Sequence, residues 1–116
     1  MQNFEVEYFE KSDHTRPAED FILSEDFKMQ AKLFRMLELL ELKGNELREP
    51  YSKYLTDGIF ELRVKQGSDI SRVLYFFVVG RKIILTNGFR KKTQKTPQTE
   101  IDLALKYKTE YEQRKE

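Results

Sequence analysis

The sequence contains no cysteine and only one histidine. Without cysteine, a disulfide framework and a thiolate metal site are both excluded, which fits a reducing compartment. No apolar run approaches the roughly 18 residues that a membrane-spanning helix needs, and the acidic, alternating N-terminus is unlike a signal peptide. From these absences we expect a soluble, cytoplasmic protein with no membrane partner.

Positive charge is concentrated in the middle of the chain. The 116 residues carry a formal net charge of +1, and this length predicts a single domain covering 1–116. Residues 48–95 hold eleven Lys and Arg against four Asp and Glu, whereas residues 1–47 hold six against eleven. A charge run is often only a solvated surface. Here the basic residues lie within and just after predicted strands, so a partner with phosphate groups is plausible.

Three apolar runs predict an antiparallel strand meander. They cover 59–64, 70–79 and 83–89 and are separated by turn signals, the second of them Gly80-Arg81. Residues 2–9 alternate apolar and polar side chains, which predicts a further half-buried strand. Residues 44–57 are expected to be a connection.

Two helices are predicted before the meander. The first covers 17–23 and begins at a proline, which suits the first helical position. Ser24 is the expected N-cap of the second helix, 27–43, whose apolar side chains recur every three or four residues. Gly44 is its expected C-terminal stop.

A last, highly charged helix is predicted after the meander, with Thr96 as N-cap and Pro97 as first helical residue. The order is then β-α-α-β-β-β-α. It predicts an α+β fold in which the helices pack on one face of a small antiparallel sheet.

Strand alternation places two arginines on one face of the meander. Arg63 and Arg72 are predicted to point outward from adjacent strands, away from the apolar side chains. With Lys53 and the basic loop at 91–92 they would form a cationic bowl. The planar, permanently charged guanidinium of arginine binds phosphate oxygens well. The transition state of phosphodiester cleavage requires such positive groups, because negative charge builds up on these oxygens. The alternative remains open that Arg63 only pairs with Glu61 and that Arg72 is a solvated strand residue.

Three segments in this order resemble RelE/ParE-superfamily toxins, in particular their phage-derived, HigB-like branch. They are DGIFELR at 57–63, RVLYF at 72–76 and NGFRKKTQKTP at 87–97. The resemblance implies a RelE-like toxin of a type II toxin–antitoxin pair. It further implies cleavage of mRNA in the ribosomal A site, in which a ribose 2′-hydroxyl attacks the adjacent phosphate and leaves a 2′,3′-cyclic phosphate, with no metal or other cofactor.

The resemblance also assigns roles to the basic residues. Arg63 and Arg72 would stabilise the charge of the phosphorane. Lys53, Lys91 and Lys92 would hold RNA or transfer protons. The predicted RNA-binding residues are Lys65, Arg90, Lys92, Lys95 and Tyr54.

The general base is left open by the sequence. His14, the only histidine, lies in a polar loop and is expected to be a plain surface residue. A lysine, Tyr54 or Tyr75 is a further candidate, although Tyr75 fits the core better and Tyr54 fits packing over the sheet. The enzyme would otherwise work by electrostatic stabilisation and substrate orientation alone.

Two other functions compete with the ribosome-dependent endonuclease. One is a ParE-like module that inhibits DNA gyrase without nuclease chemistry, and the other is a prophage remnant that has lost toxicity. In every case a cognate antitoxin, of the DNA-binding HigA type, is the expected protein partner. For the endonuclease the ribosome and mRNA are partners as well.

Overall fold

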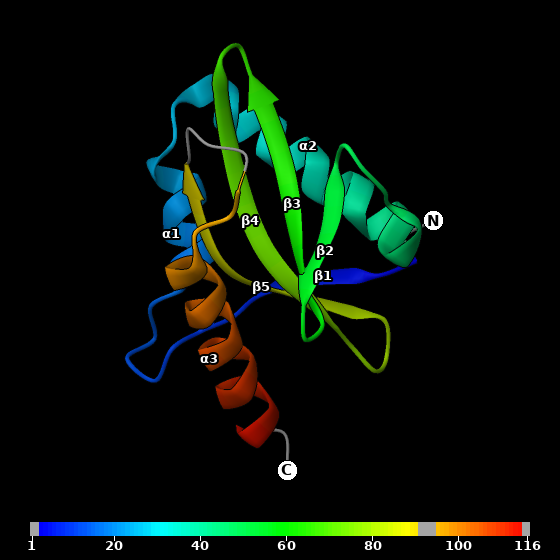
Figure 1. Ribbon diagram of the computed structural model, residues 1–116, viewed down its shortest axis with the longest axis vertical. Helices are drawn as coiled ribbons and strands as arrows, with labels where there is room; N and C mark the ends of the chain where they lie inside the picture. The colour runs from blue at the N-terminus through cyan, green and yellow to red at the C-terminus, as the bar shows by residue number, and fades with distance from the viewer. Residues whose placement is uncertain (1–2, 91–94, 115–116) are drawn as a thin grey trace.

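The computed structural model describes residues 3–90 and 95–114. Two helices follow the first strand, four strands come in succession and a last helix follows them, so the predicted α+β fold class is confirmed (Figure 1). In chain order the elements are β1 (Glu5–Tyr8), α1 (Pro17–Ser24), α2 (Phe27–Lys43), the 3₁₀ turn η1 (Gly44–Glu46), β2 (Ser52–Thr56), β3 (Ile59–Gln66), β4 (Asp69–Val78), β5 (Lys82–Arg90) and α3 (Gln98–Arg114).

The strands form one mixed sheet in the order β1-β5-β4-β3-β2. The strands β2 to β5 pair antiparallel, as the predicted meander requires. However, β1 pairs parallel with β5, so a wholly antiparallel sheet was the wrong expectation at this edge. The chain leaves β1 through α1 and α2, which carry it to the opposite edge of the sheet. A parallel neighbour needs this kind of long crossover connection.

The connection expected at residues 44–57 contains an additional strand, β2. It pairs with β3, with Lys53 opposite Glu61 and Tyr54 opposite Phe60. Its side chains are mainly polar or exposed, so the apolar alternation that marks a half-buried strand is absent. The pairing with β3 through the turn at Asp57-Gly58 decides its conformation.

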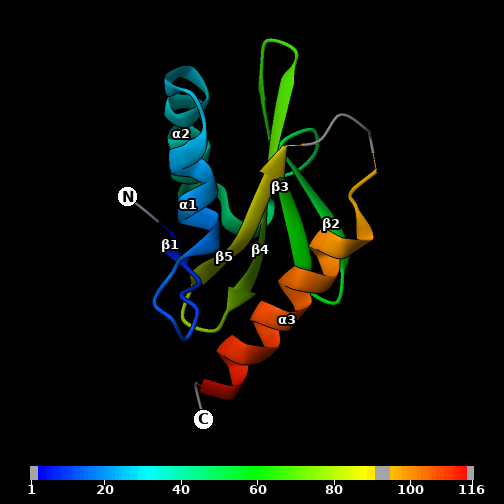
Figure 2. The same ribbon diagram turned by 90° about the vertical axis from the view of Figure 1, so that its left-hand side faces the viewer.

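Helices cover both faces of the sheet, which corrects the expected single helical layer. Figure 2 shows α1 and α2 on one side of the strands and α3 on the other. The reason lies in β4, where Val73 and Tyr75 join the core beneath α1 and α2, whereas Leu74 and Phe76 join a second core beneath α3. A strand that is apolar on both faces needs cover on both.

The predicted bounds of the long helix are confirmed, but its N-cap is not Ser24. Asp26 caps α2, since its side chain accepts a hydrogen bond from the Met29 N–H at 2.9 Å. Ser24 is instead the last residue of α1, and its hydroxyl donates to the Phe21 carbonyl at 2.7 Å. Gly44 ends α2 with a positive φ of 52°, as glycine tolerates.

The C-terminal helix α3 is the most polar of the three, with Ala104 and Tyr107 as its buried residues. The Thr96 hydroxyl, expected to cap this helix, donates a hydrogen bond to Glu61 in the middle of β3. Within residues 3–90 and 95–114, no helix combines the length and the apolar character needed to cross a bilayer.

Candidate active site

Arg63 and Arg72 lie directly opposite each other on the antiparallel strands β3 and β4. The proximity inferred from the sequence is therefore present. Their surroundings differ from an open outward face, because α3 covers part of this side of the sheet. Arg72 is only 3% exposed, whereas 21% of the Arg63 side chain is accessible. Two like charges this close need a compensating group between them.

Glu61 supplies this compensation. Its carboxylate is fully buried, and one oxygen, Oε1, accepts hydrogen bonds from Arg72 Nη1 at 2.7 Å and from Arg63 Nε at 3.0 Å. The other oxygen, Oε2, accepts from the Thr96 hydroxyl. The pairing of Arg63 with Glu61, left open by the sequence, therefore occurs, but as part of a cluster that also holds Arg72. We call Glu61, Arg63, Arg72 and Thr96 the Glu61 cluster.

The electrostatics of the Glu61 cluster keep the carboxylate ionised. Burial by itself would raise the pKa of Glu61, but the hydrogen bonds from Thr96 and Arg63 and the charge of Arg72 outweigh it and lower the pKa below its usual value. A carboxylate with a lowered pKa and three donors is a poor general base. Arg72 Nε is buried without a hydrogen-bond partner among the described residues. The cluster keeps one net positive charge.

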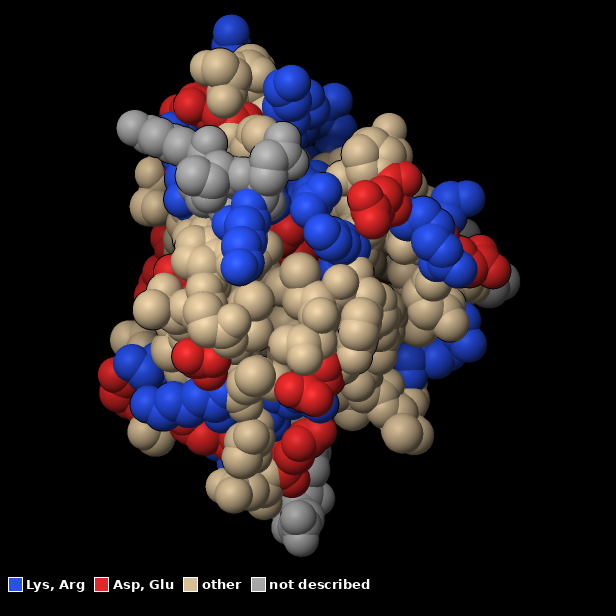
Figure 3. Space-filling view, in the orientation of Figure 1, with Lys and Arg blue, Asp and Glu red and all other residues tan. Residues whose placement is uncertain are grey.

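A pocket of about 330 Å³ opens beside the two arginines, where β3 extends beyond the start of β2. Its cations come from three elements, α2, β3 and β4, and its lining contains no acidic residue. On the face seen in Figure 3, Lys and Arg side chains gather in the upper half, around these strands. We call it the arginine pocket; it is lined by Lys32, Met36, Pro50, Tyr51, Arg63, Val64, Lys65, Ile70 and Arg72.

Three other predicted site residues meet at a second hollow of about 420 Å³, between β2 and the start of α3. Lys53, Tyr54 and Lys95 line it together with Thr96, and we call it the α3 hollow. Lys53 is the cross-strand neighbour of Glu61, and Thr96 binds Glu61 directly. Glu61 therefore contacts lining residues of both hollows.

Tyr54 has a packing role at the edge of the sheet. Its ring stands edge-on to Phe60 with 5.2 Å between centroids, and its hydroxyl accepts from the Gly58 N–H at 3.2 Å. The ring is more than half exposed beside the α3 hollow. The predicted role in RNA binding stays a prediction.

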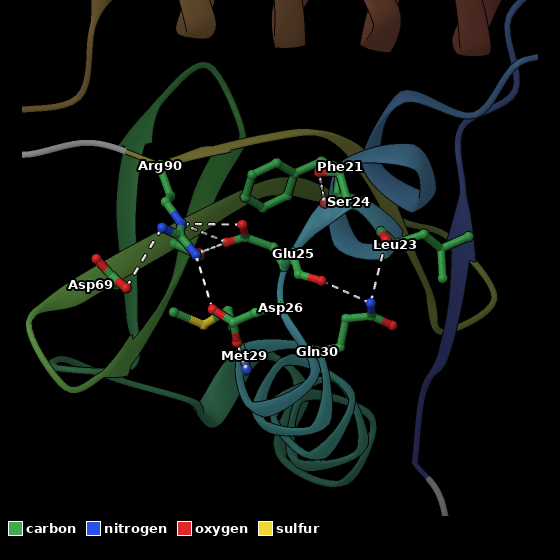
Figure 4. Close-up of polar contacts among 10 residues, drawn as sticks. Phe21, Leu23, Ser24, Glu25, Asp26, Met29, Gln30, Asp69 and Arg90 are labelled. Carbon is green, nitrogen blue, oxygen red and sulfur yellow. Dashed lines mark hydrogen bonds and ion pairs between the residues drawn. The ribbon is translucent and has the colours of Figure 1, made fainter.

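Arg90 is placed among acidic residues instead of in either hollow (Figure 4). Its guanidinium lies 3.1 Å from Glu25, 3.4 Å from Asp26 and 3.5 Å from Asp69. The Ser71 hydroxyl also donates to Glu25. Arg90 thus joins the end of β5 to the α1–α2 junction and to the β3–β4 turn. We call this arrangement the Arg90 clasp.

Several other sequence predictions concern residues away from these hollows. Lys91 and Lys92 lie outside the described residues. His14 is exposed and its Nδ1 lies 2.9 Å from Glu10, which agrees with a plain surface residue. Among residues 3–90 and 95–114, no group of three or more His, Cys, Asp or Glu side chains is placed to hold a metal ion.

Sequence reasoning did not identify the central role of Glu61, nor the contribution of Thr96, Lys32 and Tyr51. One signal for Glu61 was present: a glutamate between Phe60 and Leu62 in an apolar strand, two positions before an arginine on the same face. The others come from segments distant in the chain, which only packing brings together.

A family comparison bears on these observations. A family model described as "phage derived protein Gp49-like (DUF891)" matches residues 20–109. This range contains the Glu61 cluster and both hollows. The chain belongs to the Gp49-like family. Gp49-like proteins are a RelE-like toxin family of type II toxin–antitoxin systems, which implies an antitoxin partner. No curated protein matches the chain.

Proposed function

We propose that this Gp49-like protein is a toxin of the HigB-like branch that cleaves mRNA on the ribosome without a metal ion. The observation that supports this best is the pair Arg63 and Arg72, held side by side by Glu61 and lining a pocket together with two lysines. Preorganised positive charge next to a concave surface is what the transition state of phosphodiester cleavage needs.

The proposed reaction is intramolecular. A ribose 2′-hydroxyl loses its proton and attacks the neighbouring phosphorus, and the bond from phosphorus to the 5′-oxygen of the next nucleotide breaks. The products are a 2′,3′-cyclic phosphate and a 5′-hydroxyl, which takes up a proton. Negative charge builds up on the phosphorane oxygens, and Arg63 and Arg72 would stabilise it because their guanidinium groups are fixed before the reaction.

In one version of the mechanism Lys53 transfers the proton. In the other, no side chain acts as a base, and the enzyme works by electrostatic stabilisation and substrate orientation alone. Glu61 is engaged by three donors, as described above. Tyr75 is also unsuited, because burial raises its pKa to about 12 and its hydroxyl forms a hydrogen bond with Ser52 on the α2 side of the sheet. Lys53 is exposed, lies beside Glu61 and lines the α3 hollow, where Lys95 would help to hold RNA. The role of Lys91 in holding RNA stays a prediction from the sequence.

The antitoxin is proposed to be of the DNA-binding HigA type, with an acidic or amphipathic segment that covers the basic face. Charge complementarity supports this assignment, since the basic residues gather on the face of the Glu61 cluster. Reversal of Lys65 and Lys95 to Glu should weaken binding of the antitoxin. Equal affinity of this double variant and the wild type would contradict the proposed surface.

Induced expression in bacteria, with primer-extension mapping of a translated mRNA, tests the proposed activity. The wild type is expected to arrest growth and to produce new mRNA ends in the reading frame, and Arg63→Ala is expected to abolish both. Growth arrest with intact mRNA, an SOS response and stalled gyrase would instead establish the ParE-like inhibitor. Absence of any arrest would indicate a remnant without toxicity.

A further inference from the structure

The arginine pocket contains more positive charge than the cleavage step requires. Besides Arg63 and Arg72 it has two lysines, Lys32 from α2 and Lys65 from β3. Neither ammonium group forms an ion pair with a described carboxylate. Since Glu61 compensates one of the four charges, the pocket remains positive, and its low-dielectric walls focus the potential inward.

The remaining wall of the pocket is apolar and aromatic. Tyr51, at the mouth, is 48% exposed. Its position is fixed by backbone hydrogen bonds, because its N–H donates to the Arg48 carbonyl at 3.0 Å and its own carbonyl accepts from the Arg63 N–H at 2.8 Å. The residue therefore lies just before β2, where β3 continues without a neighbouring strand on this side. The other apolar lining residues are Met36, Pro50, Val64 and Ile70.

We propose that the arginine pocket binds one nucleotide of the mRNA, beside the phosphate that is cleaved. The base packs against Tyr51, and the nucleotide's own phosphate binds Lys32 and Lys65. This inference rests on the proposed endonuclease function and adds to it the residues that hold the substrate. Single-stranded RNA is recognised by this combination, because unstacked bases pack on aromatic rings while cations bind the backbone.

The location and size of the pocket agree with this occupant. Arg63 and Arg72 are among its lining residues, so a nucleotide inside lies next to the arginine pair. Its volume of about 330 Å³ is within the range of about 300–1,000 Å³ that is common for small-molecule sites. An acidic peptide would also satisfy the cations, but its carboxylates would leave the aromatic wall without a planar partner.

Binding of a short fluorescein-labelled single-stranded RNA to the purified full chain, followed by fluorescence anisotropy, tests the aromatic wall. Tyr51→Ala is expected to weaken binding roughly tenfold or more, because base stacking is lost. Tyr51→Phe should bind as well as the wild type, since the ring carries the contact. Phe27→Ala is the matched control: Phe27 is 86% exposed, lies outside the pocket and should not affect binding.

The same titration at several salt concentrations tests the cations. Lys32→Ala should weaken binding and lower the slope of log affinity against log salt by about 0.7, the change expected for one phosphate contact on a single strand. Lys28→Ala, one turn earlier on α2 and outside the pocket, should change neither quantity. A merely structural role of Lys32 would leave the salt slope unchanged.

The outcomes separate this inference from the proposed function. Unchanged RNA affinity in both Tyr51→Ala and Lys32→Ala, or no RNA binding by the wild type at low salt, overturns the pocket assignment even if mRNA mapping shows cleavage. Tyr51-dependent RNA binding without cleavage in the mapping assay would support the pocket as an RNA-binding site and contradict the proposed nuclease activity. Binding of a polyglutamate peptide with equal affinity and the same Tyr51 dependence would assign the pocket to an acidic protein segment instead.

Discussion

Glu61 and Arg72 form an ion pair of 2.7 Å in which both side chains are almost completely buried. A buried charge is tolerated only when it is paired and hydrogen-bonded. Arg63 and Thr96 complete the partners of the carboxylate. The residues proposed to act on RNA are therefore also part of the interior, and their substitution affects stability as well as activity.

Replacement of Glu61 by alanine is expected to lower the free energy of unfolding by about 3–5 kcal/mol, because two guanidinium groups lose their buried partner. Urea denaturation followed by circular dichroism measures this. Glu38→Ala, at an exposed position on α2, should cost less than about 0.5 kcal/mol. Equal small losses in both variants would contradict the importance of the Glu61 cluster.

Stability should fall in acid through the same carboxylate. Because the pKa of Glu61 is lowered in the folded chain, its stabilising contribution is fully present above the unfolded-state value of about 4.3. That contribution is lost as the pH falls from there through the lower folded-state pKa. The difference in unfolding free energy between wild type and Glu61→Gln should therefore shrink in this range. A difference that stays constant from neutral pH to pH 3 would show that Glu61 is not the titrating group.

The two arginines should respond differently to truncation. Arg63→Ala is expected to reduce mRNA cleavage on the order of 100-fold or more with a small effect on stability, since its side chain is partly exposed. Arg72→Ala should lose activity and also about 3 kcal/mol of stability, because a buried pair is broken. Cleavage assays and denaturation on both variants test this. Full toxicity of the double variant would refute the proposed site.

Substitution of Arg90 separates a structural role from RNA binding. If the Arg90 clasp is structural, Arg90→Ala lowers the melting temperature, more strongly at low salt, because three carboxylates lose a common partner. Arg90→Lys should recover little of the lost melting temperature, since one ammonium group cannot reach all three carboxylates. Unchanged melting with weakened RNA binding would instead support the role predicted from the sequence.

Local periodicity accounts for what could be predicted. The apolar spacing of residues 27–43 and the alternation within the three meander strands are properties of neighbouring residues, so the bounds of α2 and the shared face of Arg63 and Arg72 followed from them. The order of the three motif segments also identified the superfamily. Covalent neighbours and their side-chain spacing are sufficient for conclusions of this kind.

The tertiary structure decided what depends on residues far apart in the chain. Whether α3 would cover the second face, whether a polar segment would become β2, and which groups would surround Arg72 are not encoded in any short window. Thr96 reaches Glu61 and Lys32 reaches the arginine pocket only after the helices pack on the sheet. The sequence determined the superfamily and every strand and helix except β2. Burial on both faces of the sheet decided that the arginines share a buried carboxylate and line a pocket. The physical reason is that buried polar side chains need hydrogen-bond partners, and only tertiary packing brings those partners together.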